Sequence, residues 1–359
     1  MPRKRIINGA QAIREALDQS LAKDPRVFVV GEGVPDPKGV FGTSIGLREK
    51  YGKNRVWDMP VAENGMTGAC IGAAISGMRP VLVHQRLDFA LLSLDQIINN
   101  AAKWFYMFGG QQSVPLVIRM VIGHGWGQGA QHSQNLQALF AHIPGLKVVM
   151  PSQPQDAKGL LIAAIADPNP VIYLEHRWIH SAQGNVSKKY FTTEIGKAAI
   201  TKRGSDVTIV SSSYMALEAL RAAQLLAKIN VDAEVVDLRT ISPLDTPAIT
   251  RSVKKTGHLL VVDSGWTNGG IAGEIIARVV EKHMDVLKKP PARIALPDMP
   301  APSSPGLTKF YYPNIEMIMR KACNIIGKDP VVVAKVLAED TSLSATPHDV
   351  PNSSYMGPF

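Results

Sequence analysis

Helical patterns and short apolar runs of strand length alternate along most of this chain, and this alternation limits the possible folds more than any other feature. In the first half, Asn8 is placed to cap a helix with apolar residues at helical spacing, and an apolar strand follows at residues 27–30. In the second half, a strand pattern at residues 206–214 precedes a long helical pattern at residues 215–229. Strands joined through helices form parallel sheets, because a parallel connection needs a crossover. The sequence therefore predicts an α/β protein with two parallel-sheet domains.

The two alternating stretches are separated by residues 177–206, in which the periodicity is lost and charged and turn-forming residues accumulate. Such a composition is typical of a domain linker. We therefore expect a first domain at residues 1–185, a linker at 186–203 and a second domain at 204–330. The polar, proline-containing residues 331–359 are expected to form a tail that is mobile or is ordered by a partner.

Composition argues against several classes of protein. The 359 residues contain no apolar run long enough to cross a bilayer, and residues 1–10 lack the apolar core of a secretion signal. The net charge of +9 and the pI of 9.4 would suit nucleic-acid binding, but Lys and Arg are dispersed beyond residues 2–5. An anionic cofactor or an acidic partner subunit suits the same charge. The only two cysteines, Cys70 and Cys323, lie in apolar or small-residue stretches, which indicates a reducing compartment and by default the cytoplasm.

Glu63 is the first candidate for chemistry. It stands at the start of a glycine-rich helical pattern, where the helix dipole alone favours a carboxylate. Its neighbours Val61, Ala62 and Met66 nevertheless predict a poorly hydrated site, which would raise the pKa of the carboxyl group. A structural acid at a helix start and a functional acid are both compatible with these residues.

His132 is the second candidate. It precedes a helical pattern whose apolar residues, Leu136, Leu139, Phe140 and Ile143, share one face. Near the N-terminus of that helix the protonated imidazole is disfavoured, so a neutral His132 can exchange a proton or donate a hydrogen bond. A capping or other polar role is the more common one for a residue in this position.

Other polar and glycine-rich features carry less information. His124, His132 and His142 do not have the spacing of a metal site. The loop GHGWGQG at residues 123–129 follows a strand but fully matches neither the P-loop nor the dinucleotide fingerprint, so we interpret it as a loop that shapes a cleft. Glu32 also follows a strand, at the sheet edge where α/β proteins form their sites.

Several segments, taken in order, resemble the beta subunit of the thiamine diphosphate-dependent decarboxylating component of 2-oxo acid dehydrogenase complexes. They are GEG, PVAENGMTGACIGAAISGMRPV, DQIINNAAKWFYMFGGQ, GAQHSQNLQALFAHIPGLKVVMPSQPQDAKGLL and DLRTISPLD. The resemblance extends over residues 5–325 and is more specific than any single motif. It implies a pyrimidine-binding domain of transketolase type, followed by a transketolase C-terminal domain, in an enzyme that delivers an acyl group to a lipoyl group.

The resemblance also implies roles for particular residues. The glutamate that matches Glu63 bonds the pyrimidine ring nitrogen of the cofactor, and a proton shared there favours the imino form that activates the thiazolium ring. The aromatic residue that matches Phe89 packs on the pyrimidine, and Glu32 and Gln85 are assigned to the same cofactor site. The histidine that matches His132 lies on the substrate side, where it acts on the oxo acid or on acyl transfer.

A structural potassium ion, held largely by backbone carbonyls, is implied as well. The matching positions are Leu116, Ala164, Ile165, Asp167 and Asn169. Carbonyl oxygens suit a hard cation.

One motif of this superfamily is missing from the chain. The diphosphate is bound through magnesium by a Gly-Asp-Gly motif with a downstream Asn, and no such segment occurs here. Half of the cofactor site must therefore come from another chain. The resemblance implies an alpha subunit in an α2β2 heterotetramer, with thiamine diphosphate shared at the interface and magnesium held through the alpha subunit. It also implies a lipoyl-bearing acyltransferase as a further partner and a small 2-oxo acid as substrate.

Two departures from the family pattern concern the substrate. Gly33 stands where a second acid is usual, and His84, Gln85 and Arg86 replace the usual acidic and aromatic residues before Phe89. Arg86 can pair with a substrate carboxylate or phosphate, or it can be a solvated or structural arginine. These departures leave open a substrate other than pyruvate or a branched-chain oxo acid.

Alternative functions also fit the sequence. A transketolase-like or acyloin-forming enzyme of specialised biosynthesis would use the same cofactor and pass the activated fragment to an aldehyde. A noncatalytic subunit that shapes or regulates a complex is a third interpretation. A nucleic-acid-binding module fits least, because the positive charge is not clustered.

Overall fold

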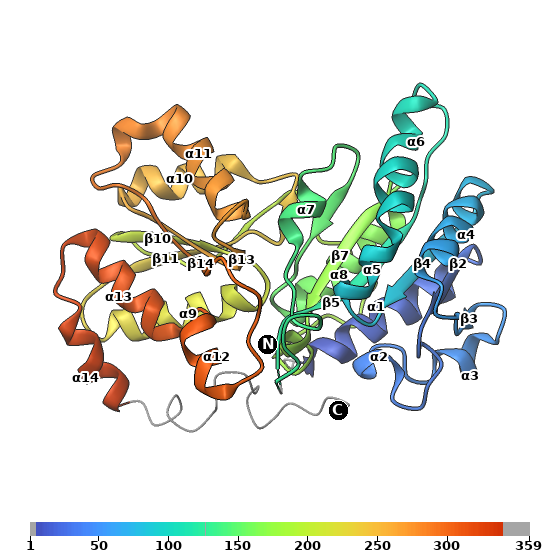
Figure 1. Cartoon of the computed structure of the whole chain (residues 1–359), viewed down its shortest axis with the longest axis horizontal. Coiled ribbons are helices and arrows are strands. Elements are labelled where there is room, and N and C mark those ends of the chain that lie inside the picture. Colours follow the sequence, from blue (N-terminus) through green and yellow to red (C-terminus); the bar gives the residue numbers. More distant parts are fainter. Residues whose placement is uncertain (1–4, 126, 340–359) are drawn as a thin grey trace. The chain divides into compact units, whose positions relative to one another are not determined.

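The computed structural model describes residues 5–125 and 127–339, which form two compact units (Figure 1). Unit 1 contains the chain up to Gly123 together with Leu139–Ile195, and unit 2 contains His124–Ala138 together with the described chain from Gly196 onwards. Each unit has its own sheet and its own hydrophobic core. The predicted α/β architecture with two domains is confirmed.

The sheet of unit 1 is parallel, with the strand order β6-β7-β5-β4-β2-β3. Its strands are β2 (Val27–Gly31), β3 (Val56–Trp57), β4 (Arg79–His84), β5 (Val117–Ile122), β6 (Lys147–Val149) and β7 (Val171–His176). The residues of β2, β5 and β7 are all buried. Strands buried on both faces are typical of parallel sheets with helices on either side.

One long helix of unit 1 begins at a residue whose side chain caps it, and a buried ion pair joins it to a second long helix. Asn8 caps α1 (Gly9–Lys23), because its side chain accepts a hydrogen bond from the Gln11 backbone while the Gln11 side chain accepts one from Asn8. Inside α8 (Pro154–Ala166) the fully buried Lys158 ammonium donates to Glu15 of α1 at 2.6 Å. A buried ammonium needs such a partner, so this ion pair fixes α1 against α8.

The remaining elements of this part of the chain are short. They are α2 (Gly39–Gly42), α3 (Leu47–Tyr51), α4 (Glu63–Ile75), α5 (Leu87–Ala90), η1 (Leu91–Ser93), the π-helix η2 (Gln96–Ala101), α6 (Ala102–Met107), α7 (Gln137–Ala141), which crosses the boundary of the units, η3 (Arg177–His180), and the antiparallel pair β1 (Ile6–Asn8) and β8 (Gln183–Asn185). Only α4 among these is longer than two turns, and it follows β3 along the chain.

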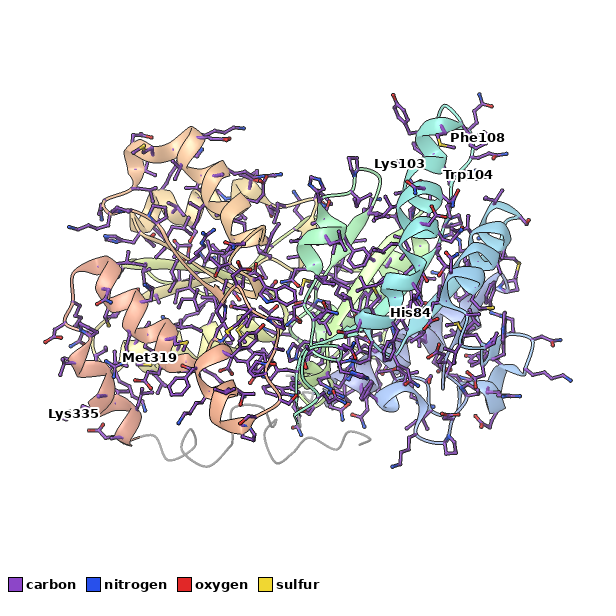
Figure 2. The ribbon with its side chains drawn as sticks, in the orientation of Figure 1. His84, Lys103, Trp104, Phe108, Met319 and Lys335 are labelled. Atoms are coloured by element: carbon purple, nitrogen blue, oxygen red, sulfur yellow. The ribbon has the colours of Figure 1, made fainter. Side chains whose placement is uncertain are left out.

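The helix α6 extends away from the sheet of unit 1 (Figures 1 and 2). Trp104 and Phe108 pack together on it with their ring centroids 4.7 Å apart, and the Lys103 ammonium donates to the Pro144 carbonyl at 2.8 Å. The sequence predicts one regular helix for this run, whereas the structure has a π-helical stretch before α6. Such π-bulges are uncommon and cannot be read from apolar spacing.

Unit 2 has a five-stranded sheet with the order β14-β13-β10-β11-β9, parallel except for the antiparallel edge strand β9. Its strands are β9 (Ala199–Lys202), β10 (Val207–Ser211), β11 (Ala233–Asp237), β13 (Leu259–Trp266) and β14 (Ala292–Leu296). The short strand β12 (Thr240–Ser242) follows β11 along the chain and is not part of this sheet. The helices are α9 (Ser213–Ala227), α10 (Thr246–Thr256), α11 (Ile271–His283), η4 (Met284–Val286), α12 (Pro305–Tyr311), α13 (Ile315–Ile326) and α14 (Val331–Glu339). Within the described ranges, no helix is long and apolar enough to span a membrane.

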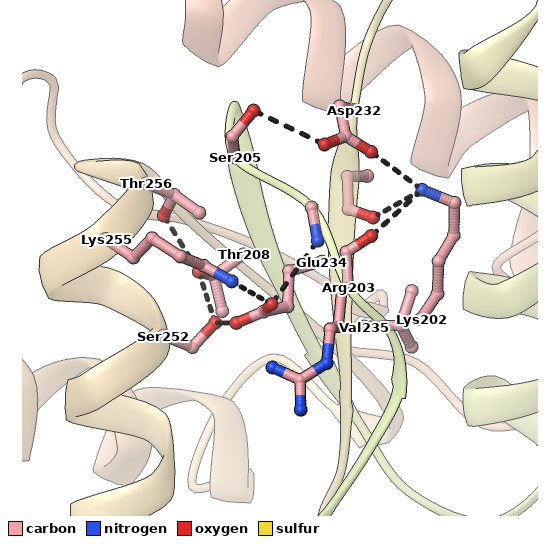
Figure 3. Close-up of polar contacts among 12 residues, drawn as sticks. Lys202, Arg203, Ser205, Thr208, Asp232, Glu234, Val235, Ser252, Lys255 and Thr256 are labelled. Atoms are coloured by element: carbon pink, nitrogen blue, oxygen red, sulfur yellow. Dashed lines mark hydrogen bonds and ion pairs between the residues drawn. The ribbon is translucent and has the colours of Figure 1, made fainter.

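A buried polar network joins α10 to the sheet of unit 2 (Figure 3). The Glu234 carboxylate on β11 accepts hydrogen bonds from Ser252 at 2.6 Å and from Lys255. The Thr208 hydroxyl on β10 bonds Ser252 and Thr256, each at 2.8 Å. Every hydroxyl in this network has a partner, which is the condition under which buried polar groups are tolerated.

Two segments differ from the sequence-based expectation. Residues 199–202, inside the range expected to be a linker, form β9, and their partly exposed residues give no apolar run to indicate a strand. Residues 331–339, at the start of the expected tail, form α14, and Val333 and Val336 are buried in the core of unit 2. The rest of the expected tail, residues 340–359, lies outside the described residues.

Candidate active site

The carboxyl ends of β2 and β4 approach closely at one edge of the sheet of unit 1. A Cβ atom on Gly31, the last residue of β2, would lie 2.2 Å from the Val83 carbonyl oxygen of β4. Only glycine permits this approach. The loop that begins at Glu32 therefore lies directly beside the residues that follow β4, at the edge where parallel sheets bind ligands.

Glu63 is the first residue of α4 and is 4% exposed. Within the described ranges, no hydrogen bond or ion pair engages its carboxylate, although its backbone carbonyl accepts from Thr67 at 2.7 Å. Glu63 is therefore a buried carboxylate with acceptor capacity that the fold does not use.

Glu32 lies within electrostatic range of Glu63. Burial, reinforced by the negative charges of Glu63 and Asp58, raises the pKa of Glu32 above its ordinary value. One of its carboxylate oxygens, Oε1, is buried without a hydrogen-bond partner among the residues that the structure describes. A carboxyl group whose proton affinity is raised by burial and by nearby acids is typical of sites that hold or transfer a proton.

Gln85 occupies the space beside Gly33, where the family usually carries a second acid. Gly33 has a φ of +69°, and a Cβ atom there would lie 2.4 Å from the Gln85 amide nitrogen. That amide donates to the Glu32 carbonyl at 3.0 Å. Gly33 and Gln85 therefore form one arrangement, in which the amide takes the place of a side chain at position 33.

Asp58 completes this edge and was not singled out from the sequence. Its carboxylate accepts hydrogen bonds from the backbone of Gly33 at 2.9 Å and of Met59 at 3.0 Å, which fixes the loop after β2. Its position in the sequence could have indicated this role, because polar residues that directly follow a parallel strand lie at the sheet edge that forms the site.

Phe89 and Arg86 both lie in or beside α5. Phe89 is half-buried. Arg86 is 4% exposed, and its guanidinium donates to the Gly123 carbonyl at 2.8 Å and lies 3.5 Å from the Asp88 carboxylate. These contacts support the structural interpretation of Arg86, because a buried guanidinium is retained where carboxylate and carbonyl partners satisfy it.

His132 belongs to the segment His124–Ala138, which packs with unit 2. It is half-buried in a bend, and α7 begins only at Gln137. The expected position of His132 near the N-terminus of a helix is therefore wrong, and the argument from the helix dipole does not apply to it. Apolar spacing from Leu136 onwards suggested a longer helix than the chain forms.

Side-chain contacts attach this segment to the rest of unit 2. The Gln137 amide donates to the Asp263 carboxylate at 2.7 Å, and the His124 ring stacks on Tyr312 with a centroid distance of 3.4 Å. Burial raises the pKa of Asp263, although the hydrogen bonds that it accepts act in the opposite direction. The loop that carries His132 is thus attached to the carboxyl end of β13.

The five carbonyl positions expected for potassium lie around the C-terminus of α8 and the start of β5. Several of these oxygens already accept hydrogen bonds from the protein: Leu116 from Val171, Ala164 from Asp167, and both Ile165 and Asp167 from Arg79. The backbone of the fifth residue, Asn169, donates to the Asp167 carboxylate. The donor set thus does not fit a potassium ion, because a guanidinium occupies the position between two of the oxygens. Among the described residues no group of three or more His, Cys, Asp or Glu could hold a metal ion.

Comparison with known proteins identifies two family domains. The transketolase pyrimidine-binding domain matches residues 6–179, and the transketolase C-terminal domain matches residues 196–318. The chain is 44% identical over 319 residues to the pyruvate dehydrogenase E1 component subunit beta-1, mitochondrial, of Arabidopsis thaliana, covering 87% of this chain and 88% of that protein. It is 44% identical over 321 residues to the acetoin:2,6-dichlorophenolindophenol oxidoreductase subunit beta of Cupriavidus necator, covering 87% and 95%.

A solved structure supports the fold. The split gene transketolase, described as an inactive beta4 tetramer, matches with a TM-score of 0.73 over 89% of this chain and 99% of that one, at 21% identity. At this identity the likeness concerns the fold alone.

Proposed function

Because the chain belongs to the transketolase-like family that includes the beta subunits of pyruvate dehydrogenase E1, we propose that it is the beta subunit of a thiamine diphosphate-dependent 2-oxo acid dehydrogenase. The observation that supports this most strongly is the buried Glu63 carboxylate, which has no partner in the described part of the chain and lies beside a second acid with a raised pKa. A buried carboxylate in this position is stabilised by a ligand that donates a hydrogen bond or shares a proton with it, as a protonated ring nitrogen can.

The residues at this edge of the sheet fit the pyrimidine half of the cofactor. Glu63 would accept a hydrogen bond from the ring nitrogen, and Glu32 has an unpartnered buried oxygen within the same edge. Phe89, which keeps part of its surface exposed, would pack against the ring face. When bound, thiamine diphosphate supplies a thiazolium carbon acid that adds to the 2-oxo group and accepts the electrons released by decarboxylation.

The chain's own contribution to catalysis is to hold a proton and to exclude water. Glu63, at the start of α4, would share a proton with the pyrimidine nitrogen in a hydrogen bond, and such a bond is stronger in a site that water does not reach. Gln85 and Asp58 hold the loop that carries Glu32 at a fixed distance from β4. This arrangement keeps the acids positioned before the cofactor binds.

The other half of the cofactor site would be supplied by an alpha subunit. The Gly-Asp-Gly motif that binds magnesium and the diphosphate is absent from all 359 residues. We propose an α2β2 heterotetramer, with magnesium held by the alpha subunit and a lipoyl-bearing acyltransferase as the acceptor of the acyl group. His132 would act on protons during that transfer, since an imidazole can both donate and accept a hydrogen bond. The two free, buried cysteines, Cys70 and Cys323, suit a reducing compartment such as the cytoplasm.

A second candidate function is supported by one of the relatives, which acts on acetoin by its name. An acyloin is cleaved by the same cofactor chemistry, in which a carbon–carbon bond next to a carbonyl group is broken. Gln85, one of the three positions that differ from the usual family residues, lies beside Glu32 at the site, and such a difference suits a change of substrate.

Co-expression of the full chain with its alpha-like partner tests both proposals. Carbon dioxide release from a panel of 2-oxo acids, and consumption of acetoin, would distinguish the two substrates. Glu63→Gln should lower either activity by roughly 10²- to 10⁴-fold, because it removes the proton that the carboxyl group exchanges. Glu281→Gln, on the exposed face of α11, is the matched control. Full activity of the Glu63→Gln complex would contradict the proposed role.

His132→Ala provides a separate test of acyl transfer. It should slow acylation of a lipoyl domain more than it slows decarboxylation with an artificial electron acceptor. Equal acylation rates for the variant and the wild type would remove His132 from the mechanism.

A further inference from the structure

Arg79, the first residue of β4, extends its side chain to the C-terminus of α8. Its Nη1 atom donates hydrogen bonds to the carbonyl oxygens of Ile165 at 2.7 Å and Asp167 at 3.1 Å. The Arg79 side chain is 19% exposed. The guanidinium thus lies at the two oxygens that the family pattern would assign to potassium.

The end of a helix explains why a cation is required there. The last carbonyls of an α-helix have no partner within the helix and carry the negative end of its dipole. In α8, which ends at Ala166, Arg79 satisfies one carbonyl of the last turn and one at the C-cap. A guanidinium supplies both the positive charge and the hydrogen-bond donors that these oxygens need.

A carbonyl oxygen has two lone pairs, so a single hydrogen bond does not by itself prevent a second interaction. The charge of the guanidinium opposes it. An ion bound to both oxygens would lie close to this guanidinium and face its positive charge, and in a partly buried site that repulsion is weakly screened.

The surrounding charges also fit a resident guanidinium. The Lys147 ammonium lies 2.5 Å from the Asp167 carboxylate, and the Arg79 Nε atom lies 3.8 Å from the Asp24 carboxylate. Among the described side chains of this cluster, the Asn169 side-chain oxygen is the one buried acceptor without a partner. The side chains thus offer a cation one amide oxygen, whereas a hard cation takes several oxygens.

We infer that the Arg79 guanidinium is the permanent cation of this carbonyl cluster, so that the chain needs no potassium ion to hold the C-terminus of α8. Arg79 acts through the fold in this role and has no contact with the reacting groups. The inference concerns unit 1 alone and does not depend on which substrate the enzyme uses.

The experiment uses the full chain co-expressed with its alpha-like partner. Thermal unfolding is measured in potassium chloride and in tetramethylammonium chloride at the same ionic strength, because the large organic cation cannot enter a carbonyl cluster. The wild-type midpoint should be the same in both salts, and desalted complex should contain no stoichiometric potassium by elemental analysis. A higher midpoint in potassium, or one potassium per chain, would overturn the inference.

Two variants test the arginine itself. Arg79→Met keeps most of the aliphatic stem and should lower the midpoint by on the order of 5 °C, because two carbonyls lose a charged donor. Arg278→Met, which removes an exposed arginine paired along α11, is the control and should change the midpoint far less. An Arg79→Met midpoint equal to that of the wild type would also overturn the inference. If this variant does not assemble, Arg79→Lys retains the charge, and its midpoint should stay insensitive to potassium.

Discussion

His84 makes the stability of unit 1 depend on pH in a way that can be worked out from the structure. It is the last residue of β4, labelled in Figure 2, and it is 2% exposed. Its Nε2 atom has no hydrogen-bond partner among the described residues, and burial lowers the pKa of the imidazole from 6.5 to about 4. The folded protein therefore keeps His84 neutral at a pH at which the unfolded chain binds a proton.

The sign and size of the effect follow from this difference. Below pH 6.5 the unfolded state takes up a proton that the folded state refuses, so the free energy of unfolding falls as the pH falls towards 4. Each pH unit in this window costs about 1.4 kcal/mol, so the full loss is about 3 kcal/mol. Between pH 7 and about 5 the loss is about 2 kcal/mol.

Replacing the histidine isolates its contribution from that of the carboxylates. His84→Leu removes the titrating group, so the free energy of unfolding of the variant should fall by about 2 kcal/mol less than that of the wild type between pH 7 and about 5. Urea unfolding of the full chain at both pH values measures this difference. His142→Leu, at an exposed histidine, controls for the loss of a histidine as such. The same pH dependence in His84→Leu and the wild type would refute the reasoning.

Further predictions concern the buried polar groups and one close backbone approach. Arg119→Met leaves the fully buried Glu175 charge without its 2.6 Å partner and should lower the free energy of unfolding by about 3–5 kcal/mol, measured by urea unfolding. Glu234→Gln should reduce the loss of stability in acid. Burial raises the pKa of the Glu234 carboxyl group, but hydrogen bonds from Lys255 and others outweigh this effect and lower the pKa below 4.5. The carboxylate therefore stabilises the fold fully above that pH, and this stabilisation is lost as the pH falls below it. An unchanged acid slope in thermal scans would contradict this. Gly31→Ala should weaken cofactor binding measured by calorimetry, because the added Cβ would lie 2.2 Å from a carbonyl oxygen beside the site. Expressed as free energies, the loss of binding should exceed the loss of stability measured from the unfolding midpoint.

The fold could be predicted where local pattern and tertiary structure agree. Asn8 and the apolar spacing after it define α1, and the continuous apolar residues of β2 define a strand buried on both faces. In contrast, β9 is a short edge strand with partly exposed residues, so its sequence does not differ from that of a loop. The helix expected after His132 comprises only Gln137–Ala141. Its start could not be predicted, because apolar spacing indicates which face of a helix is buried but not where a glycine-rich loop becomes helical.

The candidate site could be predicted only in part. Glu63 and Glu32 stand at a helix start and a strand end, positions that sequence patterns identify, and the structure brings both to one sheet edge. The contact between Arg79 and Ile165 spans 86 residues of chain, and no local pattern indicates which arginine reaches a helix end. The role of Asp58 was not predicted either, because it depends on a hydrogen bond to the backbone of Gly33, which lies far from Asp58 in the sequence.

Thiamine diphosphate binding tests the central claim most directly. Calorimetric titration with magnesium and the cofactor should be done on this chain alone, on its alpha-like partner alone, and on the assembled complex with and without Glu63→Gln. The account predicts saturable binding only in the complex, and markedly weaker binding in the Glu63→Gln complex, because this chain holds the pyrimidine and lacks the residues for the diphosphate. Equal binding by this chain alone, or undiminished binding in the Glu63→Gln complex, would contradict it.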